Sequence, residues 1–131
     1  MRPTSDMPYI PGIPDEARPL VDRLLREPPM PIDLLRMQVQ DYRQVVHQAA
    51  REKEFVDVDL ADHIADACLE LLDGVTQDAP QVERRLVQLA VRYFVEEEDA
   101  DDDMASIFGF DDDATVLNAV LNYLGREDLA V

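Results

Sequence analysis

The sequence predicts an all-α protein, a single small bundle of about five helices packed around a buried C-terminal helix. Apolar residues recur at steps of three and four along five segments, which is the spacing of one helix face. No segment shows the sustained alternation of apolar and polar residues that marks a strand. The chain has 131 residues and fits one domain, expected at residues 15–131 behind a proline-rich arm at residues 1–14.

The fifth predicted helix carries few polar residues, and these form one narrow stripe of Thr115, Asn118 and Asn122. A helix that is apolar over most of its circumference is a buried one, so we expect the other helices to pack around it. The five predicted helices cover residues 15–27, 32–54, 59–73, 79–95 and 112–124.

Residues that start and stop helices set these bounds. Asp57 or Asp59 can cap the third helix, and Asp78 is suited to cap the fourth. Gly74 is expected to end the third helix in the left-handed conformation, and Gly125 closes the fifth.

The arm contains four prolines, each of which lacks an N–H and restrains the residue before it, so an extended segment is expected. Tyr9 and Ile10 could dock the arm on the body, or the arm could hang free. The arm at Tyr9–Pro14 or a face of the second helix could also join two copies into a homodimer.

The formal net charge is −17 and is unevenly placed. Residues 1–55 contain 8 Lys and Arg against 9 Asp and Glu, whereas residues 56–131 contain 4 against 20. Such a field repels nucleic acid and anionic membrane surfaces, and it favours basic protein partners and divalent cations.

The sequence also indicates the compartment. Nothing approaches 18 consecutive apolar residues, so no membrane span is expected. The first residues lack the apolar run of a signal peptide, and the single cysteine, Cys68, excludes an internal disulfide. We therefore expect a cytoplasmic protein. Cys68 lies on an apolar helix face, where a buried and inert thiol is expected.

The last third of the chain contains an aromatic pair followed by regularly spaced aspartates, a glycine and an aspartate pair that opens the apolar helix. In this order and spacing it resembles the YkvA-like family, bacterial domains of unknown function. The resemblance implies a small helical domain and no activity. It departs from the family pattern where Glu96, Glu97 and Asp102 replace a serine and two prolines. The residues that carry the resemblance are Tyr93, Phe94, Asp99, Asp103, Gly109, Asp112 and Asp113.

Four of these aspartates form the candidate metal site. Asp99 and Asp103 could face Asp112 and Asp113 across the loop and offer carboxylate oxygens to Mg²⁺ or Ca²⁺. An EF-hand is excluded, because Met104 stands at the sixth position of the loop in place of the required glycine. The alternative is that these aspartates cap helices and turns, or are simply solvated.

No catalytic motif is present, and no catalytic or cofactor-binding residue is assigned. The sequence therefore predicts a non-enzymatic acidic helical domain that acts through protein–protein interaction, with a basic partner. The alternative is a divalent-cation-binding protein or a metal-dependent hydrolase that uses the four aspartates.

Overall fold

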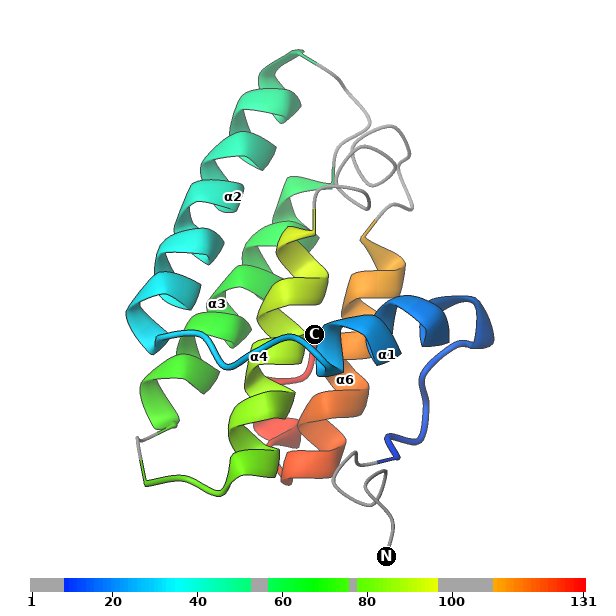
Figure 1. The fold of residues 1–131 in the computed structure, drawn as a ribbon. Coiled ribbons are helices and arrows are strands. Elements are labelled where there is room, and N and C mark those ends of the chain that lie inside the picture. The colour runs from blue at the N-terminus through cyan, green and yellow to red at the C-terminus, as the bar shows by residue number, and fades with distance from the viewer. Residues whose placement is uncertain (1–8, 53–56, 76–77, 97–109) are drawn as a thin grey trace, which may run out of the picture.

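The computed structural model describes residues 9–52, 57–75, 78–96 and 110–131, which form five α-helices and two short 3-10 helices without a strand (Figure 1). The predicted all-α bundle is therefore confirmed. The elements are η2 (Asp15–Ala17), α1 (Arg18–Leu25), α2 (Ile32–Glu52), α3 (Val58–Gly74), α4 (Gln81–Val95), α6 (Asp111–Leu124) and η3 (Glu127–Leu129).

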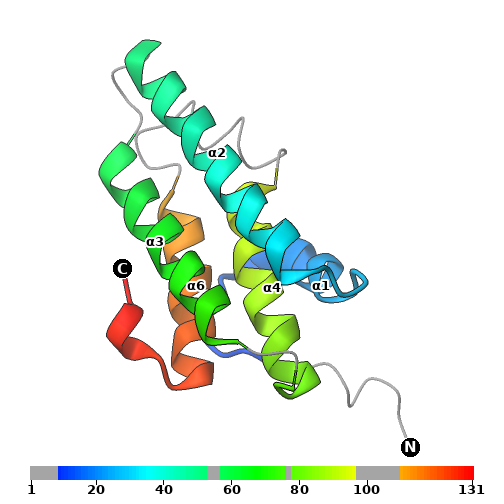
Figure 2. The same cartoon turned by 90° about the vertical axis from the view of Figure 1, so that its left-hand side faces the viewer.

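Four of the helices alternate in direction. In the view of Figure 1, α2 and α4 run upward and α3 and α6 run downward, while α1 lies across α4. The end of the bundle where α2 and α4 finish is therefore the end where α3 and α6 begin. Figure 2 shows the same arrangement from the side, with α2 packed along α3.

The core is centred on α4, which contacts α1, α2, α3 and α6. Its residues from Leu86 to Val91 are all buried, so almost no side of this stretch reaches solvent. The predicted burial of the C-terminal helix is also observed, since Val116, Leu117 and Val120 of α6 are at most 1% exposed. Among the other α-helices, α6 packs mainly against α4 and α3, so the helix around which the others pack is α4 rather than the C-terminal helix.

One aromatic cluster joins three elements of this core. The Phe94 ring of α4 meets the Tyr42 ring of α2 edge to face, with ring centroids 4.9 Å apart. Phe110, which immediately precedes α6, lies 6.4 Å from Phe94 in a tilted arrangement. Edge-to-face pairs of this kind stabilise by more than their buried area alone.

The helix ends confirm some predicted caps and overturn others. The Asp57 side chain accepts a hydrogen bond of 3.1 Å from the Leu60 amide and so caps α3. Gly125 adopts the left-handed conformation at φ 74° and closes α6.

The left-handed cap predicted at Gly74 is wrong, because α3 continues through this residue and leaves through the extended residue Val75. The cap predicted at Asp78 is also wrong. The N-cap residue of α4 is Pro80, and no side chain accepts a hydrogen bond from the first amides of the helix.

The segment before α1 is docked on the body of the protein. Ile10 and Ile13 are buried, and the Arg18 guanidinium donates to the Ile10 carbonyl at 3.1 Å. Gly12 has a positive φ of 89°, and an added Cβ there would lie 3.6 Å from that of Ala119 in α6. Residues 1–8 of the predicted arm lie outside the described residues.

Candidate functional site

Two of the four aspartates predicted as cation ligands, Asp99 and Asp103, lie outside the described residues. Asp112 and Asp113 occupy the first turn of α6, where the amide end of the helix favours negative charge. Asp112 is exposed, whereas Asp113 is 3% exposed. Within the four described ranges, no three His, Cys, Asp or Glu side chains are grouped so that they could hold a metal ion.

Asp113 lies close enough to Cys68 of α3 to act on its thiol. Burial raises the pKa of this thiol to about 12, and the negative charge of Asp113 adds to the increase. Cys68 is 0% exposed, so the predicted burial is confirmed. A neutral, inaccessible thiol is neither a nucleophile nor a metal ligand at physiological pH.

This thiol gives the protein a defined response to alkaline pH. The unfolded thiol has a pKa near about 8.5, so between this value and the folded pKa of about 12 the folded state holds the proton more tightly. Its contribution to stability is complete below pH ~8.5 and is lost as pH rises toward 12. Urea unfolding from pH 8 to 10.5 should show a steeper loss in the parent protein than in Cys68→Ala, approaching about 1.4 kcal/mol per pH unit. Parallel pH profiles of the two proteins would contradict this expectation.

The basic face of α2 is turned toward the acidic residues of α3. Arg36 pairs with Asp73, and Arg43 pairs with Asp66. The Nε2 atom of His47 lies 2.8 Å from a carboxylate oxygen of Asp62. All six groups are at least partly exposed, so each pair contributes little to stability. The pairs nevertheless place two of the arginines of α2, Arg36 and Arg43, in contact with acids of the same chain.

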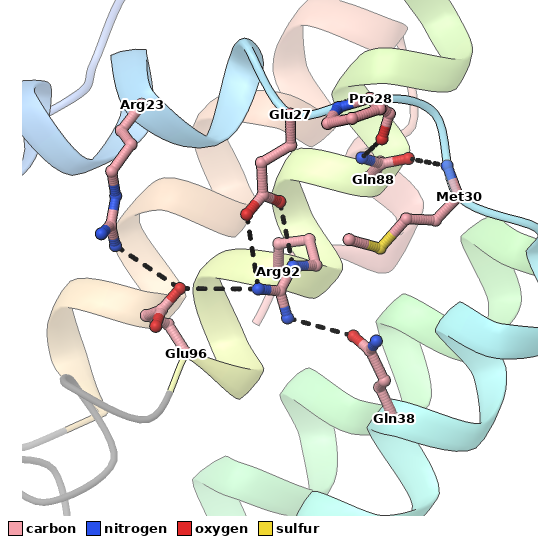
Figure 3. A network of polar contacts seen from close by, with 8 residues as sticks. All are labelled: Arg23, Glu27, Pro28, Met30, Gln38, Gln88, Arg92 and Glu96. Atoms are coloured by element: carbon pink, nitrogen blue, oxygen red, sulfur yellow. Dashed lines mark hydrogen bonds and ion pairs between the residues drawn. The ribbon is translucent and has the colours of Figure 1, made fainter.

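A second ionic group, built around Arg92 of α4, lies under α1 (Figure 3). The Arg92 guanidinium donates to both carboxylate oxygens of Glu27, at 3.0 and 3.5 Å, and to the Gln38 side chain at 3.1 Å. Glu96 lies 3.6 Å from Arg92 and 3.5 Å from Arg23 of α1. Arg92 therefore ties α4 to α2 and to the end of α1, and its two-pronged contact with Glu27 fixes the geometry.

Gln88, one turn before Arg92, holds the proline-rich segment between α1 and α2. Its side-chain amide donates to the Pro28 carbonyl at 2.9 Å, and its oxygen accepts from the Met30 amide at 2.8 Å (Figure 3). Gln88 is 7% exposed, and both ends of its side chain are satisfied. Residues 28–31, which contain three prolines and so form few backbone hydrogen bonds, are thus fixed by a single side chain.

The segment held by Gln88 forms one wall of a pocket of about 280 Å³. The pocket lies between α1, residues 28–31 and the first turns of α2 and α4. Four polar side chains of α4 line it, namely Gln81, Arg84, Arg85 and Gln88. The apolar residues that line it are Leu24, Leu25, Pro29, Met30, Ile32, Leu35, Ala79 and Val87.

Neither the buried position of Gln88 nor this pocket was predicted from the sequence. Gln88 is the one polar residue in the otherwise apolar run from Leu86 to Val91, and that position is the signal that it would be buried. Gln88 and Arg92 are four residues apart, so they share a face of α4. The spacing did not indicate that the partner of Gln88 is the backbone of a proline-rich segment about 60 residues earlier in the chain.

Acidic residues gather at the end of the bundle where α3 and α6 begin, which we call the acidic end. Asp57 and Asp59 lie at the start of α3, and Asp111 and Asp112 lie at the start of α6. All four are exposed. The residues that flank the segment 97–109, which contains six acidic residues in the sequence, also lie at this end (Figure 1).

Comparisons with protein-family models, with curated proteins and with solved structures found no match for this chain. The resemblance to the YkvA-like family therefore stays a prediction. Among the helices of the described residues, none combines the length and the apolar character that crossing a bilayer requires.

Proposed function

We propose that this protein is a non-enzymatic acidic helical domain that binds a basic segment of another protein at its acidic end. The observation that carries the proposal is the way the chain uses its positive charge. At least five of the ten arginines in the described residues are engaged in ion pairs with acids of the same chain. These five are Arg23, Arg36, Arg43, Arg92 and Arg126.

These ion pairs lie mostly along the sides of the bundle. Arg36 and Arg43 face α3, and Arg92 lies between α1, α2 and α4. In the part of the chain that the structure describes, Asp59, Asp111 and Asp112 form no ion pair with any of these arginines. The acidic end thus keeps its negative potential, which favours fast association with a positively charged partner.

The acids of this end are also compatible with the fold in the absence of a ligand. Asp59 lies in the first turn of α3, and Asp111 and Asp112 lie in the first turn of α6. Each carboxylate there interacts favourably with the amide end of its helix, typically by about 0.3–1 kcal/mol. The bundle can therefore present a concentrated charge at one end and still fold stably.

The proposal is tested with a labelled peptide of eight lysines and two matched double variants. Asp59→Asn with Asp112→Asn removes two charges at the acidic end, and Asp33→Asn with Asp78→Asn removes two exposed charges at the opposite end. We expect the first variant to weaken peptide binding about threefold, since each exposed charge contributes a few tenths of a kcal/mol. Fluorescence anisotropy of the labelled peptide at low salt measures its dissociation constant.

The opposite-end variant is the control for total charge, because it carries the same net charge as the acidic-end variant. Equal weakening by both variants would show a diffuse effect of net charge and would count against a defined acidic end. Unchanged peptide binding in both variants would overturn the proposal. Thermal unfolding of the parent protein and both variants confirms that all three are folded.

The same proteins separate this function from the divalent-cation alternative. A cation site made from Asp112 and its predicted partners would raise the unfolding temperature in MgCl₂ or CaCl₂ above that in NaCl of matched ionic strength. Screening of exposed acids alone gives no such excess. If the divalent salts raise the unfolding temperature more than NaCl does, and Asp112→Asn removes this difference, the result would favour a cation-binding protein over an interaction domain.

The proposal also includes a cytoplasmic location and a homodimer. A lone buried thiol suits the reducing cytoplasm, where no disulfide partner is needed. The α2 face that carries the exposed side chains of Leu34, Met37 and Val45 supports a homodimer through this helix. Light scattering before the peptide titration measures the molar mass of the protein and so shows whether it is a monomer or a dimer.

A further inference from the structure

We infer that the pocket beneath residues 28–31 binds a small amphipathic anion, a medium-chain carboxylate with its tail among the apolar side chains and its head at Arg84. This binding goes beyond the proposed interaction at the acidic end and uses a different part of the molecule. The volume of the pocket, about 280 Å³, lies just below the usual range of ligand pockets, roughly 300–1,000 Å³. The occupant is therefore a small molecule.

The walls of the pocket specify an apolar body for the ligand. Leu24 and Leu25 come from α1, Ile32 and Leu35 from α2, and Val87 from α4. Two further polar side chains that line the pocket, Gln88 and Glu27, are already engaged elsewhere. Gln88 bonds to the backbone of residues 28–30, and the Glu27 carboxylate is held by Arg92 (Figure 3).

The charge at the mouth of the pocket specifies an anionic head group. In a protein of net charge −17, Arg84 and Arg85 are neighbours on the pocket side of α4. The Arg85 guanidinium donates to the Leu25 carbonyl at 3.5 Å. Arg84 has neither an ion pair nor a side-chain hydrogen bond within the described residues, so its guanidinium is available to a carboxylate.

The start of α4 strengthens the same end of the pocket. The helix begins at Gln81, its N-cap is Pro80, and no side chain caps its first amides. Ala79, Gln81 and Arg84 all line the pocket, so the positive end of the helix lies beside the guanidinium. A carboxylate here would meet a positive charge and helix amides together, with its tail directed between α1 and α2.

The test follows the methionine methyl groups by NMR in full-length protein during titration with sodium octanoate. Met30 lines the pocket, and Met37 is 55% exposed on α2, so one titration contains its own control. We expect the Met30 methyl signal to shift in a saturable way and the Met37 signal to stay. Hexanoate should bind about fifteenfold more weakly, at about fourfold per methylene removed.

The role of the charge is measured with 1-octanol and two arginine variants. Arg84→Gln should weaken octanoate binding about tenfold and leave octanol binding unchanged, because only the carboxylate uses the guanidinium. Arg51→Gln, which removes the same charge from the far end of α2, should leave octanoate binding unchanged. Equal binding of octanol and octanoate, equal shifts at Met30 and Met37, or equal effects of the two variants would each overturn the inference.

Discussion

Replacing Phe94 with alanine is expected to lower the free energy of unfolding by about 4 kcal/mol, the usual cost of removing a buried phenylalanine ring. Phe94 is 1% exposed and contacts the rings of Tyr42 and Phe110, so the cavity would open where α2, α4 and the start of α6 meet. The free energy of unfolding of such a domain is roughly 5–15 kcal/mol. The midpoint of thermal unfolding should fall by about 15 °C.

Phe94→Leu is the matched variant, because it retains most of the apolar volume and removes only the ring contacts. We expect it to cost about 1–2 kcal/mol, which separates the aromatic contribution from the loss of packing. Urea unfolding of the three proteins gives the comparison. A loss below about 2 kcal/mol in Phe94→Ala would show that the three helices do not depend on this cluster.

Replacing Gln88 with leucine is expected to destabilise the protein by about 2 kcal/mol, although leucine is apolar and its site is buried. The side chain satisfies the Pro28 carbonyl and the Met30 amide at 2.9 and 2.8 Å. Leucine leaves both backbone groups without this partner, and an unsatisfied buried polar group costs about 1–3 kcal/mol. Urea unfolding monitored by circular dichroism measures the change.

Gln44→Leu is the control for this variant, because Gln44 is an exposed glutamine on α2. A substitution there should change the free energy of unfolding by less than about 0.5 kcal/mol. If Gln88→Leu were neutral or stabilising, residues 28–31 would hold their position without the glutamine. The wall of the pocket would then not depend on α4.

The fold class and most helix bounds could be predicted because they depend on local signals. The apolar periodicity located α2, α4 and α6, and a glycine in the left-handed conformation closed α6 at Gly125 as expected. The caps at Gly74 and Asp78 failed because the route of the chain between helices decides them. The chain leaves α3 through the buried, extended residue Val75, and α4 begins only after Pro80.

The candidate sites were harder to predict, because neighbours in sequence can face different surroundings. Asp112 and Asp113 are adjacent and equally suited to a helix start, yet one is exposed and the other is buried near Cys68. The spacing of Asp113, Val116 and Val120 does place this aspartate on the apolar face of α6. The pocket had no local signal, since it needs the distant proline segment to be fixed on α4.

The polar contacts of α1 and of residues 28–31 have a consequence for the order of folding. The hydrogen bonds between residues 25–30 and α4 join residues that are 58, 60 and 65 positions apart in the chain. The ion pairs between α2 and α3 span only 15 to 37 positions. Since shorter loops close at a smaller entropic cost, the α2–α3 hairpin can form early, while α1 gains its anchors only after α4 has been added. The pocket is therefore among the last parts of the molecule to take shape, although most of its residues come early in the sequence.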